Sequence, residues 1–357
     1  MYLGNIVYIF AFYCLLLLSF LFNRIKNFFT IYLACSSVIV VSVFLGFRSL
    51  DSGKDTHGYV KYFTDGFKNF NFEFGFYYFS KFLSYFLDAA GYLYVIAVLS
   101  TIFLALAAFS FKIKNISLVV LIYSGLLPGL DMLTNTIRNG LALNISALII
   151  ILSLHIRKFK ILTLLPAIIH NSTVLTALIS ALSVKHKLHR VNIFLFFLSS
   201  LLFLAFSFIN IDIYSFATKY NTGSDLLSKL VRYIILDKDL LDKSVEMYFK
   251  AISLILALPY VYCVIVSRNF RYDELIHRLM FVAMLLVLFY AAFSLAEFSY
   301  RFMYLSYPLL VITSVYCYEK YFKSTLSHIV FYSFTLLLTL ITFTTSTFES
   351  YKLLYLL

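Results

Sequence analysis

Long, unbroken apolar runs recur along nearly the whole chain, and they limit its fold more than any other feature. A helix that crosses the hydrocarbon core of a bilayer needs about 20 consecutive apolar residues. Two stretches, Phe74–Ala90 and Ile161–Ser183, are apolar but ambiguous. The clear candidates for spanning helices are Ile6–Phe22, Phe28–Phe47, Tyr92–Phe111, Ile116–Leu130, Thr134–Leu154, Val191–Ile209, Met247–Ser267, Leu279–Ala296, Phe302–Tyr318 and Leu326–Thr345.

The apolar residues follow one another without the alternation that is typical of a membrane-facing strand. In lipid every backbone polar group must be paired, and a continuous apolar run achieves this within its own helix. The composition agrees, because 62% of the residues are hydrophobic and 13% are charged, against roughly half and about a quarter in soluble domains. We therefore predict an all-α polytopic transmembrane protein, a single integral membrane domain over residues 1–357 with about ten to twelve membrane segments, re-entrant helices among them.

Short basic links separate many of the apolar runs. Cytoplasmic loops are rich in Lys and Arg, and all of these links lie on that side only if the two ambiguous stretches do not change sides. Phe74–Ala90 is then a re-entrant or interfacial helix, and Ile161–Ser183 is a hairpin with Pro166 and His170 near its tip. If both stretches cross the membrane, two of the links lie outside instead. The links are Arg24/Lys26, Lys112/Lys114, Arg157/Lys158/Lys160, Lys185/Lys187/Arg190, Arg268/Arg271/Arg278 and Lys320/Lys323.

The net charge of +12 does not require nucleic acid as a partner. Basic links that meet anionic lipid account for most of it, and the remainder is available to an anionic substrate. The four cysteines lie within apolar runs and show no CxxC or Cys/His ligand spacing, and the chain contains no P-loop or GxGxxG motif. We therefore expect neither a metal nor a cofactor.

With this topology, two long loops lie outside, at about residues 48–72 and 210–246. Arg48 stands at the boundary of a span, where its guanidinium either grips a phosphate or anchors the helix end by reaching the interface. Asp55 follows in the same loop and is a candidate general base. Glu73 opens an apolar stretch, either as a helix N-terminal residue or as a functional acid.

Two candidates lie deeper in apolar sequence. Arg138 is a few residues into a predicted span, where a charge is costly and by default functional. His170 is either a proton acceptor or a hydrogen-bond donor in helix packing. In the outer regions, Arg232 belongs to a basic and aromatic segment. Glu297 and Arg301 are four residues apart, so they form either a local ion pair or an anion ligand held by an acid.

In their order along the chain, several short motifs resemble those of the EpsG-type branch of Wzy-like bacterial polysaccharide polymerases. These motifs are Arg48 with Gly53-Lys54-Asp55 and Tyr59, Glu73-Phe74-Gly75-Phe76, Arg138-Asn139-Gly140-Leu141-Ala142, Ile169-His170-Asn171-Ser172-Thr173, and Arg301 with Tyr304 and Pro308. We expect a GT-C-like membrane glycosyltransferase architecture.

The resemblance implies a polymerase of repeat units carried on undecaprenyl diphosphate, for O-antigen, capsule or exopolysaccharide. It would lie in the bacterial inner membrane and act at its periplasmic or outer face on a lipid-linked donor and acceptor. A flippase and a chain-length regulator are candidate partners. The alternatives are a flippase or transporter of the lipid-linked oligosaccharide, and a membrane sugar acyltransferase. A transporter would predict symmetry between the two halves of the chain, which the sequence does not display.

The resemblance also assigns roles to individual residues. The candidates for base or acceptor orientation are Asp55, Glu73 and His170, the candidate diphosphate ligands are Arg48, Arg138 and Arg301, and Arg232 joins these ligands from its loop context. Tyr59, Glu297 and Tyr304 are expected to support them.

Overall fold

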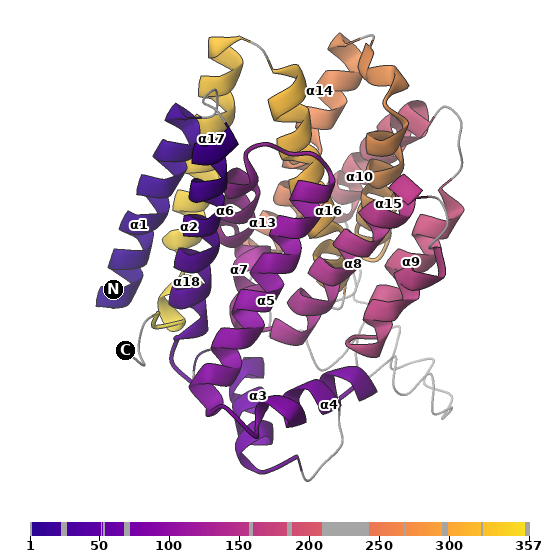
Figure 1. Cartoon of the computed structure of the whole chain (residues 1–357). Coiled ribbons are helices and arrows are strands. Elements are labelled where there is room, and N and C mark those ends of the chain that lie inside the picture. The colour runs from indigo at the N-terminus through magenta and orange to yellow at the C-terminus, as the bar shows by residue number, and fades with distance from the viewer. Residues whose placement is uncertain are drawn as a thin grey trace. The chain divides into compact units, whose positions relative to one another are not determined.

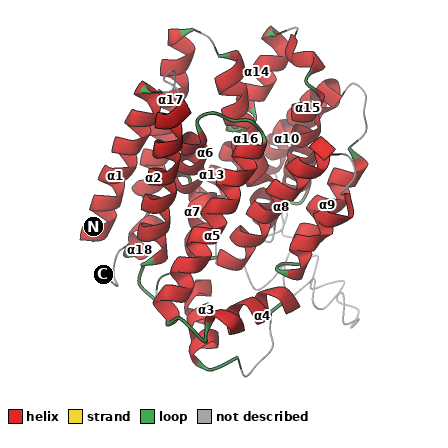
Figure 2. Cartoon of the chain, viewed as in Figure 1, coloured by secondary structure: helices red, strands yellow, loops and turns green. Residues whose placement is uncertain are grey.

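The structure is a computed structural model that describes residues 2–22, 27–50, 52, 54–67, 72–156, 160–183, 188–208, 243–267, 269–294, 299–322 and 324–353. Every regular element in these ranges is a helix, and no strand occurs among them (Figures 1 and 2). The chain forms two compact units, residues 1–182 with 311–357 (unit 1) and residues 183–310 (unit 2). Residue 310 falls within one helix, so the chain passes from unit 2 into unit 1 along it. The prediction of one membrane domain stays a prediction.

Unit 1 contains most of the described helices. They are α1 (Leu3–Leu21), α2 (Asn27–Gly46), α3 (Lys54–Thr64), α4 (Phe74–Leu83), α5 (Ala89–Ser110), α6 (Ile116–Gly125), α7 (Leu127–Thr134), α8 (Ile137–Ile156), η1 (Lys160–Ile168), α9 (Thr173–Leu182), α17 (Thr325–Phe343) and α18 (Ser346–Ser350). Unit 2 contains α10 (Leu188–Phe208), α13 (Lys243–Ile255), α14 (Leu258–Val266), η2 (Asn269–Tyr272) and α15 (Glu274–Ala292). Helix α16 (Tyr300–Tyr321) is the one shared between the units.

Eight helices in the described part of the chain are long and apolar enough to cross a membrane, with α13 and α14 taken together as one. The other seven are α1, α2, α5, α8, α10, α15 and α17. A bent pair, α6 with α7, raises the number to nine if it counts as one span. The prediction of an all-α multi-pass membrane protein is confirmed, whereas the predicted number of segments stays a prediction.

The run expected as a single span over Ile116–Leu130 is instead broken. Helix α6 ends at Gly125, and α7 continues at an angle of 85° to it. Leu126 between them is extended, and Pro128 lies in the first turn of α7, where a residue without a backbone N–H is tolerated. Gly125 also allows close packing, because a Cβ there would lie 2.4 Å from the ring of Phe12.

The two ambiguous stretches form short helices, as the topology predicted. Helix α4 has 10 residues, and at 1.5 Å per residue it is about 15 Å long, too short to cross a bilayer. Within Ile161–Ser183, η1 and α9 pack against each other and against α8, with His170 in the turn between them. This is the predicted hairpin, with His170 at its tip.

An aromatic cluster fixes α3 and α4 to the ends of α5 and α8. Phe63 stacks on Tyr92 with ring centroids 4.4 Å apart, and Phe76 is fully buried beside Tyr59. Ile137, the first residue of α8, belongs to the same cluster. In Figure 1, α3 and α4 lie at the lower end of unit 1, the end at which α18 also lies. The candidate functional residues of unit 1 lie on the loops and helix ends that this cluster holds together.

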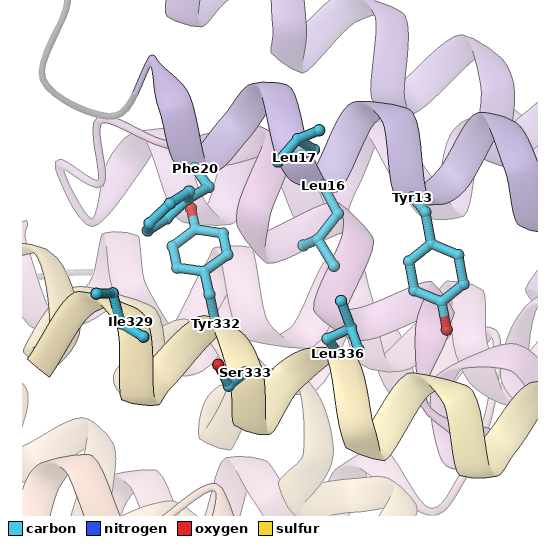
Figure 3. Close-up of a pocket in the computed structure, with 8 residues that line it drawn as sticks. All are labelled: Tyr13, Leu16, Leu17, Phe20, Ile329, Tyr332, Ser333 and Leu336. Carbon is cyan, nitrogen blue, oxygen red and sulfur yellow. The ribbon is translucent and has the colours of Figure 1, made fainter. Parts of the chain in front are cut away.

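A groove of about 360 Å³ opens between α1 and α17, away from those residues (Figure 3). Apart from three hydroxyl groups, its lining is apolar. None of the candidate site residues lines it. The lining residues are Tyr13, Leu16, Leu17, Phe20, Ile329, Tyr332, Ser333 and Leu336.

Candidate active site

An ion pair joins two of the sequence motifs in unit 1. The Nη1 of Arg138 donates to Oε2 of Glu73 at 2.6 Å, and the two side chains are 19% and 15% exposed. Arg138 lies in the first turn of α8, nearer to the helix end than the predicted span placed it. Glu73 precedes α4, and the guanidinium of Arg138 also lies over the ring of Phe72, 4.8 Å from its centroid. The pair therefore links the starts of two helices that are far apart in the sequence.

The second carboxylate oxygen of Glu73 holds the hairpin tip. Its Oε1 accepts from the backbone N–H of Asn171 at 3.1 Å. One carboxylate thus connects the start of α4, the start of α8 and the turn between η1 and α9. Three motifs that are separate in the sequence, those of Glu73, Arg138 and His170, therefore meet at one carboxylate.

Hydrogen bonds to His170 favour one neutral tautomer. The backbone N–H of Ser172 donates to Nδ1 of His170 at 3.2 Å, and the Ser172 hydroxyl lies 2.6 Å from the same nitrogen. A backbone amide can only donate, so this contact favours the neutral tautomer that accepts at Nδ1 and carries its proton on Nε2. The Ser172 hydroxyl also lies 3.3 Å from Oδ1 of Asn139, next to Arg138. The hairpin tip is therefore anchored on the first turn of α8.

Tyr59 lies beneath this cluster and is almost fully buried. Its ring stacks on Phe72 at 5.4 Å between centroids. Burial raises the pKa of the Tyr59 hydroxyl, and the charge of Arg138 opposes the shift. Tyr59 therefore stays neutral at physiological pH. Asp55, one helical turn earlier on α3, is exposed, and its backbone N–H donates to Oδ1 of Asn135 at 2.9 Å.

Arg48 has no exposed surface. Its Nη1 donates to the backbone oxygen of Leu45 at 2.7 Å, and its Nη2 donates to Oγ1 of Thr56 at 3.2 Å and to the backbone oxygen of Thr134. Burial lowers the pKa of Arg48 to about 9, while the charge of Asp131 opposes the shift. The guanidinium is therefore still a cation at neutral pH, and it is enclosed by protein acceptors.

The remaining candidates lie in unit 2 or outside the described residues. Arg301 and Tyr304 belong to unit 2, where Arg301 is exposed in the first turn of α16 and Tyr304 is buried against Phe249. Arg232 and Glu297 lie outside the described residues. Within the described ranges, no three His, Cys, Asp or Glu side chains gather closely enough to hold a metal ion.

The sequence analysis missed two residues beside Arg48. Oδ1 of Asp131 accepts from the hydroxyl of Tyr351 at 3.1 Å. Neither Asp131 nor Tyr351 was among the candidates predicted from the sequence. Their separation of 220 residues left no sequence signal that could pair them.

The cluster around Arg138 is suited to an anionic group. The guanidinium of Arg138 is partly exposed, whereas that of Arg48 is not. The Nε atoms of both residues are buried without a hydrogen-bond partner among the described residues, and a buried donor without an acceptor is costly. The hairpin tip adds further polar groups beside it. Such an arrangement provides an arginine cation at the end of a helical bundle, where it can bind an anionic group.

The fold and this cluster define a multi-pass α-helical membrane protein with a charged site at one end of its unit 1 bundle. The chain belongs to the EpsG family, whose family model matches residues 31–356. Family membership supports a polymerase-type role in polysaccharide biosynthesis. Comparison with curated proteins gave no match, and comparison with solved structures gave none either. The GT-C-like architecture therefore stays a prediction.

Proposed function

We propose that the chain polymerises oligosaccharide repeat units carried on undecaprenyl diphosphate. It would transfer the growing glycan from its lipid diphosphate to the sugar of an incoming lipid-linked unit, in the bacterial inner membrane and at the periplasmic or outer face. The observation that carries the proposal is the Arg138 cation, which is partly exposed and held by Glu73 at the hairpin tip.

In this reaction the bond between the anomeric carbon and the diphosphate oxygen breaks. A hydroxyl oxygen of the acceptor sugar forms the new bond to the same carbon and gives up its proton to a base. The leaving diphosphate keeps the bonding electrons and gains negative charge, which a positioned arginine stabilises. Because arginines neutralise this charge, we expect the reaction to proceed without a bound metal ion.

Within the proposal, Arg138 binds the diphosphate and Glu73 orients Arg138. Glu73 accepts hydrogen bonds from Arg138 and Asn171 through both oxygens, so it is less suited to accept a proton than the exposed carboxylate of Asp55. The charges of Arg138, Asp55 and Glu73 each affect the pKa of the Tyr59 hydroxyl. The three charged groups therefore lie near the same side chain. We propose Asp55 as the base.

His170 has a different role in this account. Its neutral form carries the proton on Nε2, so it donates a hydrogen bond to an oxygen of the sugar or the diphosphate. Arg301 is a further candidate ligand for the second lipid-linked substrate. The other expected partners are membrane lipid, a flippase and a chain-length regulator.

The test uses cells that lack this chain, complemented with wild type, Arg138→Ala or Lys61→Ala. Lys61 is a matched control, because it is an exposed cation on α3 in the same part of unit 1. The expected result is a polysaccharide ladder on a gel with wild type and Lys61→Ala. With Arg138→Ala, single lipid-linked units should reach the outer face without a ladder.

Two outcomes would contradict the proposal. If no units reach the outer face in cells that lack the chain, the chain is a flippase. If the ladder persists in those cells and only a substituent is missing, the chain is an acyltransferase.

A further inference from the structure

Arg48 makes contacts that join three parts of unit 1. Its acceptors are the backbone oxygen of Leu45 at the end of α2, the hydroxyl of Thr56 on α3 and the backbone oxygen of Thr134 at the end of α7. With no exposed surface, its guanidinium cannot meet a diphosphate unless these contacts break. Arg48, which the sequence predicted as a diphosphate ligand, is thus enclosed within unit 1.

The contact with Thr134 caps a helix end. The last four carbonyl groups of a helix have no partner within it, and the helix dipole places partial negative charge there. The Thr134 carbonyl accepts from Arg48 and also from the Thr56 hydroxyl, at 2.5 Å for the latter. A cation at this position stabilises the end of α7 and determines where the chain turns into α8.

A buried cation needs a nearby negative charge. Asp131 lies one turn before Thr134 on α7, and its charge opposes the lowering of the Arg48 pKa by burial. The carboxylate of Asp131 is held by the hydroxyl of Tyr351 at 3.1 Å and by the hydroxyl of Thr136 at 3.3 Å. The hydroxyl of Tyr351 remains a donor, because burial and the charge of Asp131 raise its pKa.

The segment that carries Tyr351 is itself pinned. The backbone N–H of Ser49, next to Arg48, donates to the backbone oxygen of Lys352 at 3.2 Å. The backbone N–H of Leu353 donates to Oδ1 of Asn5 at 2.8 Å, and Nδ2 of Asn5 donates to the backbone oxygen of Phe348 at 3.2 Å. The described end of the chain is thus attached to α1 and to the loop after α2.

We propose that Arg48, Asp131 and Tyr351 are positioning residues that hold the junction between α7 and α8, and that the segment after α17 is therefore part of the active-site framework. The junction carries Asn135, which accepts from the backbone N–H of Asp55, and it directly precedes Arg138. Displacement of the junction moves both the proposed base and the proposed diphosphate ligand. The expected effect on the reaction rate rests on the proposed function. The expected effect on the structure of the junction does not depend on that function.

The experiment compares wild type with Tyr351→Phe and Asp131→Asn, with Tyr85→Phe as the control. Tyr85 is exposed in the turn after α4, so its variant removes a tyrosine hydroxyl without touching the junction. The proteins are purified and reconstituted in lipid nanodiscs. Two quantities are measured, the hydrogen exchange of the backbone amides over residues 134–138 and the kinetics with a purified lipid-linked repeat unit.

We expect exchange over the junction to rise about tenfold in Tyr351→Phe and further in Asp131→Asn. The kcat should fall by about tenfold or more while KM changes little, because misplacement by about 1 Å can cost a hundredfold in rate. Tyr85→Phe should match wild type in both. A fourth variant, Arg48→Lys, should also lose kcat with little change in KM, since an ammonium cannot reproduce the planar set of hydrogen bonds.

Unchanged hydrogen exchange over residues 134–138 in both Tyr351→Phe and Asp131→Asn would overturn the proposal. A higher KM with an unchanged kcat in Arg48→Lys would also overturn it, because a residue that binds substrate behaves in that way. If wild type forms no polymer while exchange rises in Tyr351→Phe, the positioning role stands and the proposed function fails.

Discussion

Glu73 accepts a hydrogen bond from Arg138 at 2.6 Å through one oxygen, while its other oxygen holds the backbone of the hairpin tip. The two residues are 65 positions apart in the sequence. Their pairing brings together two helix starts and the turn that carries His170.

The charge pair predicts separable effects on stability and activity. Glu73→Gln or Arg138→Gln leaves one partly buried charge without its partner, which should cost about 1–3 kcal/mol. The exchanged pair, Glu73→Arg with Arg138→Glu, should recover much of the thermal stability of the purified protein. It should not recover polymer formation, because the cation has moved to α4. Polymer formation by the exchanged pair would contradict the assignment of Arg138 as diphosphate ligand.

The glycines of two motifs allow close helix packing. A Cβ at Gly75 would lie 2.4 Å from Cγ2 of Ile168 in the hairpin, and one at Gly140 would lie 2.3 Å from the backbone oxygen of Met132 in α7. Gly75→Ala and Gly140→Ala should therefore each cost about 1–3 kcal/mol through overpacking and displace the helix ends that carry Glu73 and Arg138.

Gly58 on α3 provides the matched control, because a Cβ there would meet nothing within 4 Å. Gly58→Ala should leave activity intact and add about 0.5–1 kcal/mol of helix stability. Thermal unfolding together with the length of the polymer ladder distinguishes these outcomes. Equal effects of the three substitutions would show that the close packing at the two motif glycines is not important.

The hydroxyl of Ser172 predicts a moderate effect on rate. Ser172→Ala removes the contact to Nδ1 of His170 and the contact to Asn139 but keeps the backbone N–H that favours the tautomer. We expect a decrease in polymerisation rate of about tenfold, smaller than the loss caused by His170→Ala. Ser84→Ala is the control, since the hydroxyl of Ser84 makes only a local bond to the backbone oxygen of Lys81. A Ser172→Ala rate equal to that of wild type would mean that the orientation of His170 does not depend on this hydroxyl.

The sequence predicted which segments carry the site, but it did not predict how the side chains on those segments contact one another. Glu73, Arg138 and His170 were candidates because each places a polar group at or within apolar sequence, where such groups are costly. The hairpin over Ile161–Ser183 followed from the distribution of basic links, and its observed form agrees.

Other features had no comparable signal. The bend between α6 and α7 lies in a continuous apolar run, so hydropathy alone did not reveal that Gly125 and Pro128 interrupt it. Arg48 stands at a helix end, where ligand and anchor have the same sequence pattern. Two of its three acceptors are backbone carbonyl groups, those of Leu45 and Thr134, and the sequence cannot identify such groups as partners.

Reconstituted protein tests the central claim most directly. Vesicles that contain the purified chain receive purified lipid-linked repeat units, and free undecaprenyl diphosphate is measured together with new glycosidic bonds. The account predicts one lipid diphosphate released for each bond formed by wild type and neither product with Arg138→Ala. Movement of intact lipid-linked units across the vesicle membrane, without a new bond or a released diphosphate, would contradict it.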